Sequence, residues 1–344
     1  TDTATVTIVV NDVAPSITYG TTSLTLEKGT AMTTQTPTSS GGTVTSWSVS
    51  PSLPAGLSLD TSTGAISGTP TAVTSSASYT VTATNTGGTD TASLTIVVND
   101  VAPSISYSST SLTLEKGTAM TTLTPTTGGG AITSWSVSPS LPAGLSLDSS
   151  TGAISGNPTA VASSAVYTIT ASNTGGSDTA SITIVVNDVI PSDLDYSPNS
   201  FTLTKGTQMT TVTPTANGGT ITGWSVSPSL PSGLSLDSST GAISGTPTAV
   251  TSSAVYTITA TNTGGNDTAT VTIVVNDIAP SIAYSPSSLT LTKGTAMTTA
   301  TVTSTGGAVV SYAVSPSLPA GLSLDTSTGA ISGTPTAITS SASY

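Results

Sequence analysis

The sequence contains no cysteine, no histidine and no arginine, and lysine, at four positions, is its only basic residue. Without histidine or cysteine, the chain has no imidazole base, thiol nucleophile, soft-metal ligand or disulfide. Without arginine, it lacks the bidentate clamp that recognises phosphate and carboxylate groups. The net charge of −12 opposes binding to nucleic acid and to anionic lipid. These absences exclude most enzyme classes, so we expect no catalytic residue, no cofactor and no nucleic-acid partner.

Apolar residues are present, but only in short runs. They make up 35% of the 344 residues, too many for a disordered chain, and are mainly Ala, Val, Leu and Ile interleaved with Thr, which favours β-strands. Runs such as residues 96–98 are far too short to span a bilayer, so we predict no membrane insertion. The lack of cysteine fits a reducing cytosol or a microbial surface protein without disulfides. Because Ser and Thr account for 136 residues, we favour an extracellular or cell-surface location.

The chain is built from a repeat of about 88 residues. Residues 53–71 recur unchanged at residues 318–336, and one extra residue lies between Pro191 and Phe201. Single residues mark the same positions in successive repeats: Pro15, Pro103, Pro191 and Pro280; Trp47, Trp135, Trp224 and Tyr312; Tyr79, Tyr167, Tyr256 and Tyr344; and Lys28, Lys116, Lys205 and Lys293. A unit of this size can close a small core of its own.

These markers predict the domain boundaries. We place the repeats at residues 13–100, 101–188, 189–277 and 278–344, after residues 1–12, which match the last strand of a preceding repeat. The fourth repeat is incomplete, since the equivalents of its last two strands are missing. Either the chain is a window from a longer array, or its first strand completes the last repeat of a neighbouring chain. We favour the window, because a donated strand would not replace the one that matches residues 80–85.

Within a repeat, apolar and polar residues alternate over short runs that are separated by turn residues. No run has helical periodicity, and the pattern predicts six or seven antiparallel strands per repeat. We therefore expect an all-β fold of Greek-key sandwiches of the immunoglobulin type. The runs lie at residues 23–27, 45–49, 57–59, 65–67, 79–83 and 92–98. The residues expected to stabilise the first core are Trp47, Leu57, Leu59, Ile66, Tyr79, Val81, Leu94 and Ile96.

Two aromatic residues of the repeat have predicted structural roles. Trp47 lies in the middle of a strand and has a tyrosine counterpart in the fourth repeat, which favours packing between the sheets over sugar binding. Tyr79 begins its strand as the residue of a tyrosine corner does, so we expect its hydroxyl to bond to the backbone.

Three segments carry a family resemblance: residues 53–71 (LPAGLSLDTSTGAISGTPT), 78–88 (SYTVTATNTGG) and 93–100 (SLTIVVND). They resemble the Ig-like repeat of bacterial and archaeal surface proteins, which is related to the dystroglycan-type cadherin-like domain. The resemblance recurs in every unit. It implies tandem immunoglobulin-like or cadherin-like sandwiches that serve as stalk and adhesion parts of large surface proteins.

The similarity to cadherins, which bind calcium at their linkers, raises the possibility of a metal site. Glu27 matches the first acidic element of a cadherin repeat, but Thr204 replaces it in the third repeat, and residues 97–103 keep only the Asn-Asp pair of the linker. One carboxylate is few for an ion that takes about six to eight oxygens. A solvated or turn-capping aspartate is the alternative. The weak calcium candidates are Asp12, Asp100, Asp188 and Asp277.

Each repeat holds its single lysine at one position. Lys28 lies in a predicted turn at residues 27–30, where we expect a solvated side chain that protects a strand edge. The alternative is an internal crosslink to Asn or Asp, as in some Gram-positive surface domains. That chemistry needs a buried lysine and a second carboxylate.

The repeats are joined without a Gly/Ser spacer, and a proline in each linker limits bending. Successive repeats should therefore stack end to end as an elongated rod, in which each contacts mainly its neighbours. We predict a non-enzymatic extracellular structural protein of a bacterium or archaeon that acts as a stalk, surface fibre or filament. Its expected partners are copies of itself or neighbouring repeats, and a cell-surface or matrix molecule.

Two other functions remain open. The repeats of an adhesin would bind glycan or protein directly and would present an exposed aromatic or polar patch that recurs on one face. Alternatively, the chain is an accessory region of a large secreted enzyme. The candidates for the patch follow the linker prolines, where packing between domains explains them equally well: Tyr19, Tyr107, Tyr196 and Tyr284.

Overall fold

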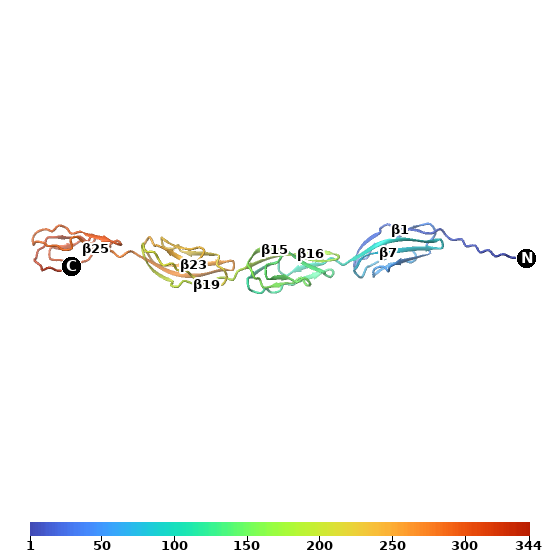
Figure 1. Cartoon of the computed structure of the whole chain (residues 1–344), viewed down its shortest axis with the longest axis horizontal. Coiled ribbons are helices and arrows are strands. Elements are labelled where there is room, and N and C mark those ends of the chain that lie inside the picture. Colours follow the sequence, from blue (N-terminus) through green and yellow to red (C-terminus); the bar gives the residue numbers. More distant parts are fainter. The chain divides into compact units, whose positions relative to one another are not determined.

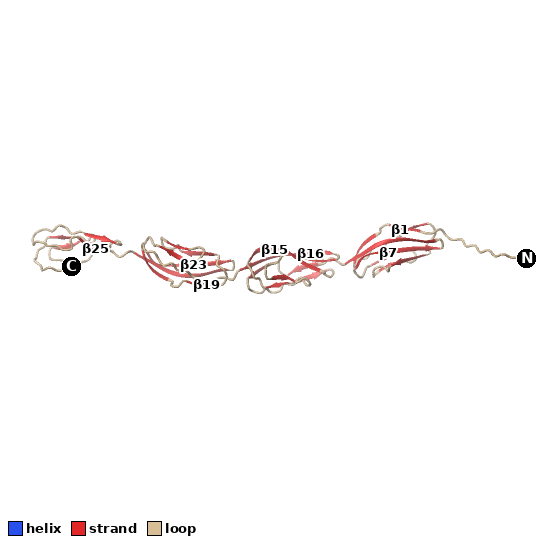
Figure 2. Ribbon diagram, in the orientation of Figure 1, coloured by secondary structure: helices blue, strands red, loops and turns tan.

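Strands and loops make up the whole chain (Figure 2). The computed structural model describes all 344 residues. They fall into two compact units, Thr1–Asn187 and Asp188–Tyr344, and each unit is described by itself. The boundary between the units lies one residue from the predicted boundary between the second and third repeats. No helix is long and apolar enough to cross a membrane.

The first repeat folds into two layers of strands. One layer is a four-stranded sheet in the order β2-β8-β7-β4, and the other contains the pairs β1-β3 and β5-β6. An isolated bridge between Gln35 and Ile66 joins the two pairs, and β1 and β7 can be followed in Figure 1. The strands are β1 (Ser16–Tyr19), β2 (Ser23–Glu27), β3 (Pro37–Ser40), β4 (Ser46–Ser50), β5 (Leu57–Leu59), β6 (Ile66–Gly68), β7 (Thr74–Asn85) and β8 (Gly88–Asn99).

The hairpin of β7 and β8 forms the centre of the four-stranded sheet. Side chains on a strand point alternately to its two faces, so most apolar residues of both strands line one face, and the other face carries mainly Thr and Ser together with Val97. The turn is held by Asn85, whose Oδ1 accepts hydrogen bonds from the Gly87 and Gly88 amides at 2.8 and 3.1 Å. The inward-facing residues of the hairpin are buried: Tyr79, Val81, Ala83, Leu94, Ile96 and Val98.

The second repeat, which completes the first unit, has the same sheets, with the four-stranded order β10-β16-β15-β12. Its strands are β9 (Ser104–Tyr107), β10 (Ser111–Glu115), β11 (Pro125–Gly128), β12 (Ser134–Ser138), β13 (Leu145–Leu147), β14 (Ile154–Gly156), β15 (Ala162–Asn173) and β16 (Gly176–Asn187).

The second unit contains the third repeat, with the four-stranded order β18-β24-β23-β20, and the fourth repeat, with the pairs β25-β26 and β27-β28. The extra residue of the third repeat accompanies a register shift in β17 between Ser192 and Asp195. The strands are β17 (Ser192–Asp195), β18 (Ser200–Thr204), β19 (Thr215–Asn217), β20 (Gly223–Ser227), β21 (Leu234–Leu236), β22 (Ile243–Gly245), β23 (Thr251–Asn262), β24 (Gly265–Asn276), β25 (Ser281–Tyr284), β26 (Val302–Thr305), β27 (Leu322–Leu324) and β28 (Ile331–Gly333).

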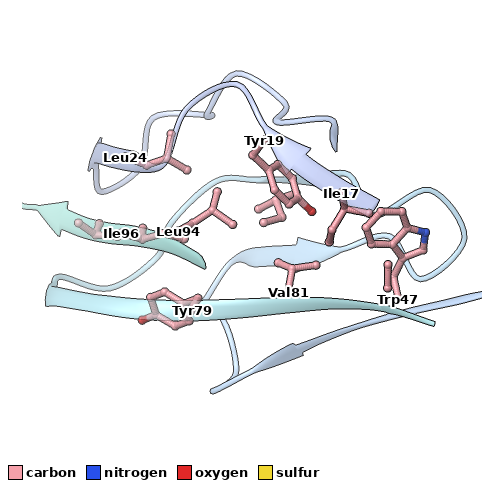
Figure 3. Packing of buried hydrophobic residues seen from close by; sticks show 11 residues of the cluster. Ile17, Tyr19, Leu24, Trp47, Tyr79, Val81, Leu94 and Ile96 are labelled. Carbon is pink, nitrogen blue, oxygen red and sulfur yellow. The ribbon is translucent and has the colours of Figure 1, made fainter. Parts of the chain in front are cut away.

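Each of the first three repeats has its own hydrophobic cluster. In the first, Ile17 and Tyr19 on β1 face the side of the hairpin that carries Val81 (Figure 3). Most of the predicted core residues are buried there, whereas Leu57 and Leu59 are half-buried and pack against the cluster. Burial at about 25 cal/mol per Å² makes these clusters the main source of stability of each repeat.

The prediction of six or seven antiparallel strands was wrong in number and in one direction. Each of the first three repeats has eight strands, because Ser16–Tyr19 and Pro37–Ser40 also pair. The pair β2-β8 is parallel, from Ser23 opposite Thr95 to Glu27 opposite Asn99. The reason is that the chain crosses from one layer to the other after β1 and then continues as β2 beside the last strand of the repeat. The fold remains a tandem immunoglobulin-like β-sandwich.

Candidate functional site

The linker between the first two repeats is docked on the second repeat. Asp100 follows β8 and is only 9% exposed. Its Oδ2 accepts a hydrogen bond from the Ala131 amide at 3.1 Å, and its own amide donates to Thr174 Oγ1 at 2.9 Å. Asn173 Nδ2 donates to the Val101 carbonyl at 2.6 Å. Three polar contacts therefore hold the linker against the loops of the following repeat.

Glycines line the surface on which this linker lies. A Cβ built on Gly175 would lie 1.9 Å from the Asp100 carbonyl oxygen, and one on Gly130 would lie 2.4 Å from that of Val101. Any side chain at these positions would push the linker backbone away. The two glycine-containing loops are therefore parts of the joint as well as turns.

Two of the other predicted linker aspartates, Asp12 and Asp188, lie in the same kind of joint, whereas Asp277 is exposed and bonds only to the residue that follows it. Asp12 Oδ2 accepts a hydrogen bond from the Thr43 amide, and Asp188 Oδ2 accepts one from the Thr220 amide, each at 3.1 Å. The amides of both aspartates donate to a threonine hydroxyl. Asp277 Oδ1 accepts from the Ile278 amide at 2.9 Å. Their side chains thus organise the linker backbone, which is the turn-capping role considered as the alternative to calcium.

Lys28 of the first repeat lies beside the joint formed by Asp100. Its amide donates to the Asn99 carbonyl at 2.9 Å. Its ammonium Nζ lies 3.8 Å from Asp100 Oδ1, and the lysine side chain is 44% exposed whereas that of Asp100 is 12% exposed. Lys28 is therefore partly solvated and also faces a carboxylate. Its exposure does not provide the buried setting that an internal crosslink requires.

The surroundings of Asp100 do not fit a calcium ion. Both of its carboxylate oxygens accept amide hydrogen bonds, from Val101 and Ala131, and the Lys28 ammonium lies beside Oδ1. No group of three or more acidic side chains converges on one point that could hold a metal, whereas calcium takes about six to eight oxygens. The linker aspartates remain weak calcium candidates, without a matching ligand set around Asp100.

A second recurring aspartate ties the first strand of a repeat to the last. Asp178 Oδ2 accepts a hydrogen bond from the Ile105 amide at 2.8 Å. The amides of Ile105 and Thr179 lower the pKa of this carboxyl group. Sequence reasoning missed this tie, although an aspartate two residues after each Gly-Gly turn was its signal. The equivalent pairs are Asp90 with Ile17 and Asp267 with Leu194.

The tyrosines considered for an adhesive patch point into their own repeats. Tyr19 is 7% exposed, its hydroxyl donates to the Gly64 carbonyl at 2.5 Å, and burial raises its pKa to about 12. These tyrosines therefore do not form an exposed patch, because Tyr19 and Ile17 face inward from residues 16–19. The equivalent bonds join Tyr107 to Gly152, Tyr196 to Gly241 and Tyr284 to Gly329.

Trp47 and Tyr79 are core residues, as predicted, with exposed fractions of 6% and 4%. The indole of Trp47 lies over Gly64, where an added Cβ would come within 2.6 Å of the ring. The bond from a hydroxyl to the backbone that was predicted for Tyr79 is made by Tyr19 instead. Figure 3 shows Trp47 beside Ile17 within the cluster.

The turn at residues 60–65 positions Gly64 for these contacts. Asp60 Oδ1 accepts hydrogen bonds from the Ser62 amide, the Ser62 hydroxyl and the Thr63 amide at 2.8, 2.7 and 3.1 Å. These bonds stabilise the ionised carboxylate and lower its pKa. The equivalent bonds in the second and third repeats lower the pKa of Asp148 and Asp237 to about 2. The acidic groups of these turns are therefore engaged in local structure.

A shallow hollow in the second repeat lies beside Trp135. It is lined by residues 127–132, Trp135, Ser150 and Thr151. None of these residues is titratable, so the hollow offers hydroxyl and backbone groups without an acid or base.

The two-layered sandwiches and their docked linkers define the class of tandem immunoglobulin-like repeats. The family model described as "Putative Ig domain" matches residues 7–99, 102–187, 190–276 and 279–344. The chain belongs to this family.

Curated relatives include the "Serine-rich adhesin for platelets" of Staphylococcus aureus strain MRSA252, which is 33% identical over 188 residues, 52% of this chain and 13% of the relative. Another Staphylococcus aureus protein of the same name is 35% identical over 191 residues, 52% of this chain and 8% of the relative. The matches thus span a small part of these relatives' own length.

Among solved structures, the I-band fragment I67-I69 from titin is 16% identical with a TM-score of 0.37, covering 78% of this chain and 100% of that chain. The N-terminal four Ig domains of Dscam1 isoform 7.44 are 13% identical with a TM-score of 0.32, covering 79% of this chain and 74% of that chain.

Proposed function

We propose that this chain is a non-enzymatic, length-making part of an extracellular protein on the surface of a bacterium or archaeon, as a stalk, surface fibre or filament. The docked linker is the observation that supports this most. A repeat with its own core that also binds the preceding linker adds length and restricts bending at once. The family membership and the name of the relatives, "Serine-rich adhesin for platelets", support the location.

The placement of the acidic side chains supports a structural role. Asp60 caps a turn, Asp90 joins two strands, and Asp100 docks a linker. A catalytic acid or base needs access to a substrate proton, whereas these carboxylates are occupied by backbone amides.

Two measurements test this function. Antibodies against residues 1–344 should label the outside of intact source cells, and small-angle scattering from the purified chain should give an elongated particle one sandwich thick. Labelling that requires permeabilised cells would contradict the extracellular location. A scattering profile of freely jointed domains would contradict the stiff array but leave the location standing.

Direct adhesion is a second candidate, favoured by the names of the relatives. Platelets are the test surface that those names specify. Retention of the purified chain on immobilised platelets, in excess over a surface coated with albumin, would support adhesion by the repeats themselves. Equal retention on both surfaces would leave the length-making role alone.

A further inference from the structure

Asp100 contacts both of the repeats that it joins. Toward the following repeat, its Oδ2 accepts the Ala131 amide and its own amide donates to Thr174. Toward the preceding repeat, its Oδ1 lies 3.8 Å from the Lys28 ammonium. One carboxylate with little exposure thus receives hydrogen bonds from one repeat and a positive charge from the other.

The lysine and the linker aspartate recur at a fixed separation of 72 residues. In each of three repeats, the lysine amide donates to the carbonyl of the last residue of the final strand at 2.9 Å, which anchors the lysine at the linker. All basic side chains of the chain belong to this position. The sequence pairs are Lys28 with Asp100, Lys116 with Asp188 and Lys205 with Asp277.

We propose that Lys28 and Asp100 form an electrostatic joint that restricts the movement of the first two repeats relative to one another. Removing a carboxylate from water is unfavourable unless hydrogen bonds and opposite charge compensate for it. The second repeat supplies the amides and the first supplies the ammonium, so Asp100 is fully compensated only when both repeats are in place. The chain itself provides the positive charge that a bound cation would otherwise bring.

The joint rests on the proposed length-making function, because it explains stiffness at a linker. It does not depend on where the protein is located. Labelling of cells can therefore fail while the joint holds, and the reverse is equally possible. The competing explanation is a joint that binds calcium at the same aspartate, and the two predict opposite responses to the loss of Lys28 and to a chelator.

The absence of cysteine allows a direct test on the full chain. Spin labels on Ser48→Cys and Ser136→Cys, both exposed strand positions of the first and second repeats, report the distribution of distances across the joint by pulsed electron resonance. With Lys28 present, we expect a narrow distribution with and without chelator. With Lys28→Gln, the ratio of docked to undocked molecules should fall about two- to fivefold, the range for a partly exposed ion pair.

Three further samples decide the interpretation. Lys28→Arg keeps the charge and should restore the narrow distribution. Lys205→Gln removes the same type of residue from another repeat and should leave the distribution unchanged. Salt at about 1 M, where the Debye length is about 3 Å, should act like Lys28→Gln. An unchanged distribution in Lys28→Gln, or one that narrows only when calcium is added, would overturn the proposal.

A measurement of folding accompanies each variant. Lys28 is 44% exposed, so its substitution should leave the melting temperature of the chain nearly unchanged. A broad distance distribution in a fully folded variant then reports the joint. If melting and distances change together, the lysine supports the fold of its own repeat, and the joint is contradicted.

Discussion

At the residue scale, one glycine in each turn serves two aromatic residues at once. The Gly152 carbonyl accepts a hydrogen bond from the Tyr107 hydroxyl at 2.6 Å, and its Cα faces the ring of Trp135. Its φ of +72° belongs to the left-handed region, which residues with a Cβ enter at a cost. The aspartate at the start of the turn, Asp148, holds the backbone in this shape. A short polar turn therefore determines how the aromatic core residues pack.

Replacing Gly152 with alanine should destabilise the second repeat by about 2–4 kcal/mol, since left-handed strain adds to overpacking against Trp135. The added Cβ would lie 2.5 Å from the indole ring. Urea unfolding followed by Trp135 fluorescence measures this loss, in a background where Trp47 and Trp224 are changed to tyrosine, the residue of the fourth repeat.

Gly117 provides the matched control. It has a φ of +84° but nothing within 4 Å of an added Cβ. Gly117→Ala should therefore destabilise the second repeat only by the cost of the left-handed backbone conformation, about 1–2 kcal/mol. Equal losses in the two variants would mean that the indole does not require the glycine.

Acid should weaken the same turn. The Ser150 hydroxyl and amide, with the Thr151 amide, lower the pKa of Asp148 from 3.8 to about 2 in the folded chain. A carboxyl group with a lower pKa in the folded state stabilises the fold above the unfolded value, and this contribution is lost as the pH falls through the folded value. The melting temperature of the second repeat should therefore drop between pH 4 and pH 2.

Asp148→Asn and Ser150→Ala test the source of that drop. The first variant removes the titrating group, and the second removes its strongest hydrogen bond. Both should show a smaller decrease on acidification than the unmodified chain in differential scanning calorimetry. If both retain the full decrease, the acid sensitivity comes from other carboxylates.

At the element scale, the long hairpin carries more than half of the buried hydrophobic residues in each of the first three repeats. Ile184 on β16 is completely buried, whereas its neighbour Val185 is half-buried on the opposite face. Because the strands alternate faces, two adjacent residues contribute very differently to stability.

Ile184→Ala should destabilise the second repeat by about 2–5 kcal/mol, through lost burial and the cavity that remains. Val185→Ala should stay below about 1 kcal/mol, because its side chain lies outside the core. Urea unfolding of the same tryptophan background compares the two directly. A similar loss in both would contradict the assignment of faces.

Most strands of a repeat could be predicted from the sequence, but two strands of four residues were missed. β2, β4 and β8 were found because apolar residues occupy every second position over five or more residues. β1 and β3 have four residues each, and Pro37–Ser40 contains no aliphatic residue. Their pairing depends on the layer opposite, and the parallel pairing of β2 with β8 joins segments about 70 residues apart. The local sequence pattern predicts neither the pairing of β1 with β3 nor the parallel pairing of β2 with β8.

The joints were located by the sequence but not explained by it. The recurrence of Asp100 and its equivalents marked the linkers, and the resemblance to cadherins suggested a metal. The groups that bind Asp100 lie at Lys28 and Ala131, before and after it in the chain. Only the fold brings these groups together, so the linker sequence alone does not reveal that amides and an ammonium contact Asp100.

At the scale of the whole molecule, stability is divided among separate cores. A metal bound at each linker would change the melting temperature of the repeats that the linker joins. We expect the melting profile of the chain to be unchanged by millimolar EDTA and by added calcium, because the linker aspartates accept amides. A ligand that bound only the folded state would raise the melting temperature, so an upward shift with calcium would establish a site.

Mechanical resistance should follow from the parallel pair in each repeat. β2 lies near the start of the repeat and β8 is its last strand, and five residues of each are paired in parallel. Tension on the two ends of the repeat therefore pulls these strands in opposite directions along their length and loads their hydrogen bonds together. Pulling the chain from both ends should give three high-force events, one for each of β2-β8, β10-β16 and β18-β24, each releasing about 250–300 Å of chain.

Lys28→Pro removes the amide that donates to Asn99 and should lower the force of one event. Lys28→Gln, which keeps that amide, should leave all three forces unchanged. Three low-force events in the unmodified chain would show that the parallel pairs bear no load.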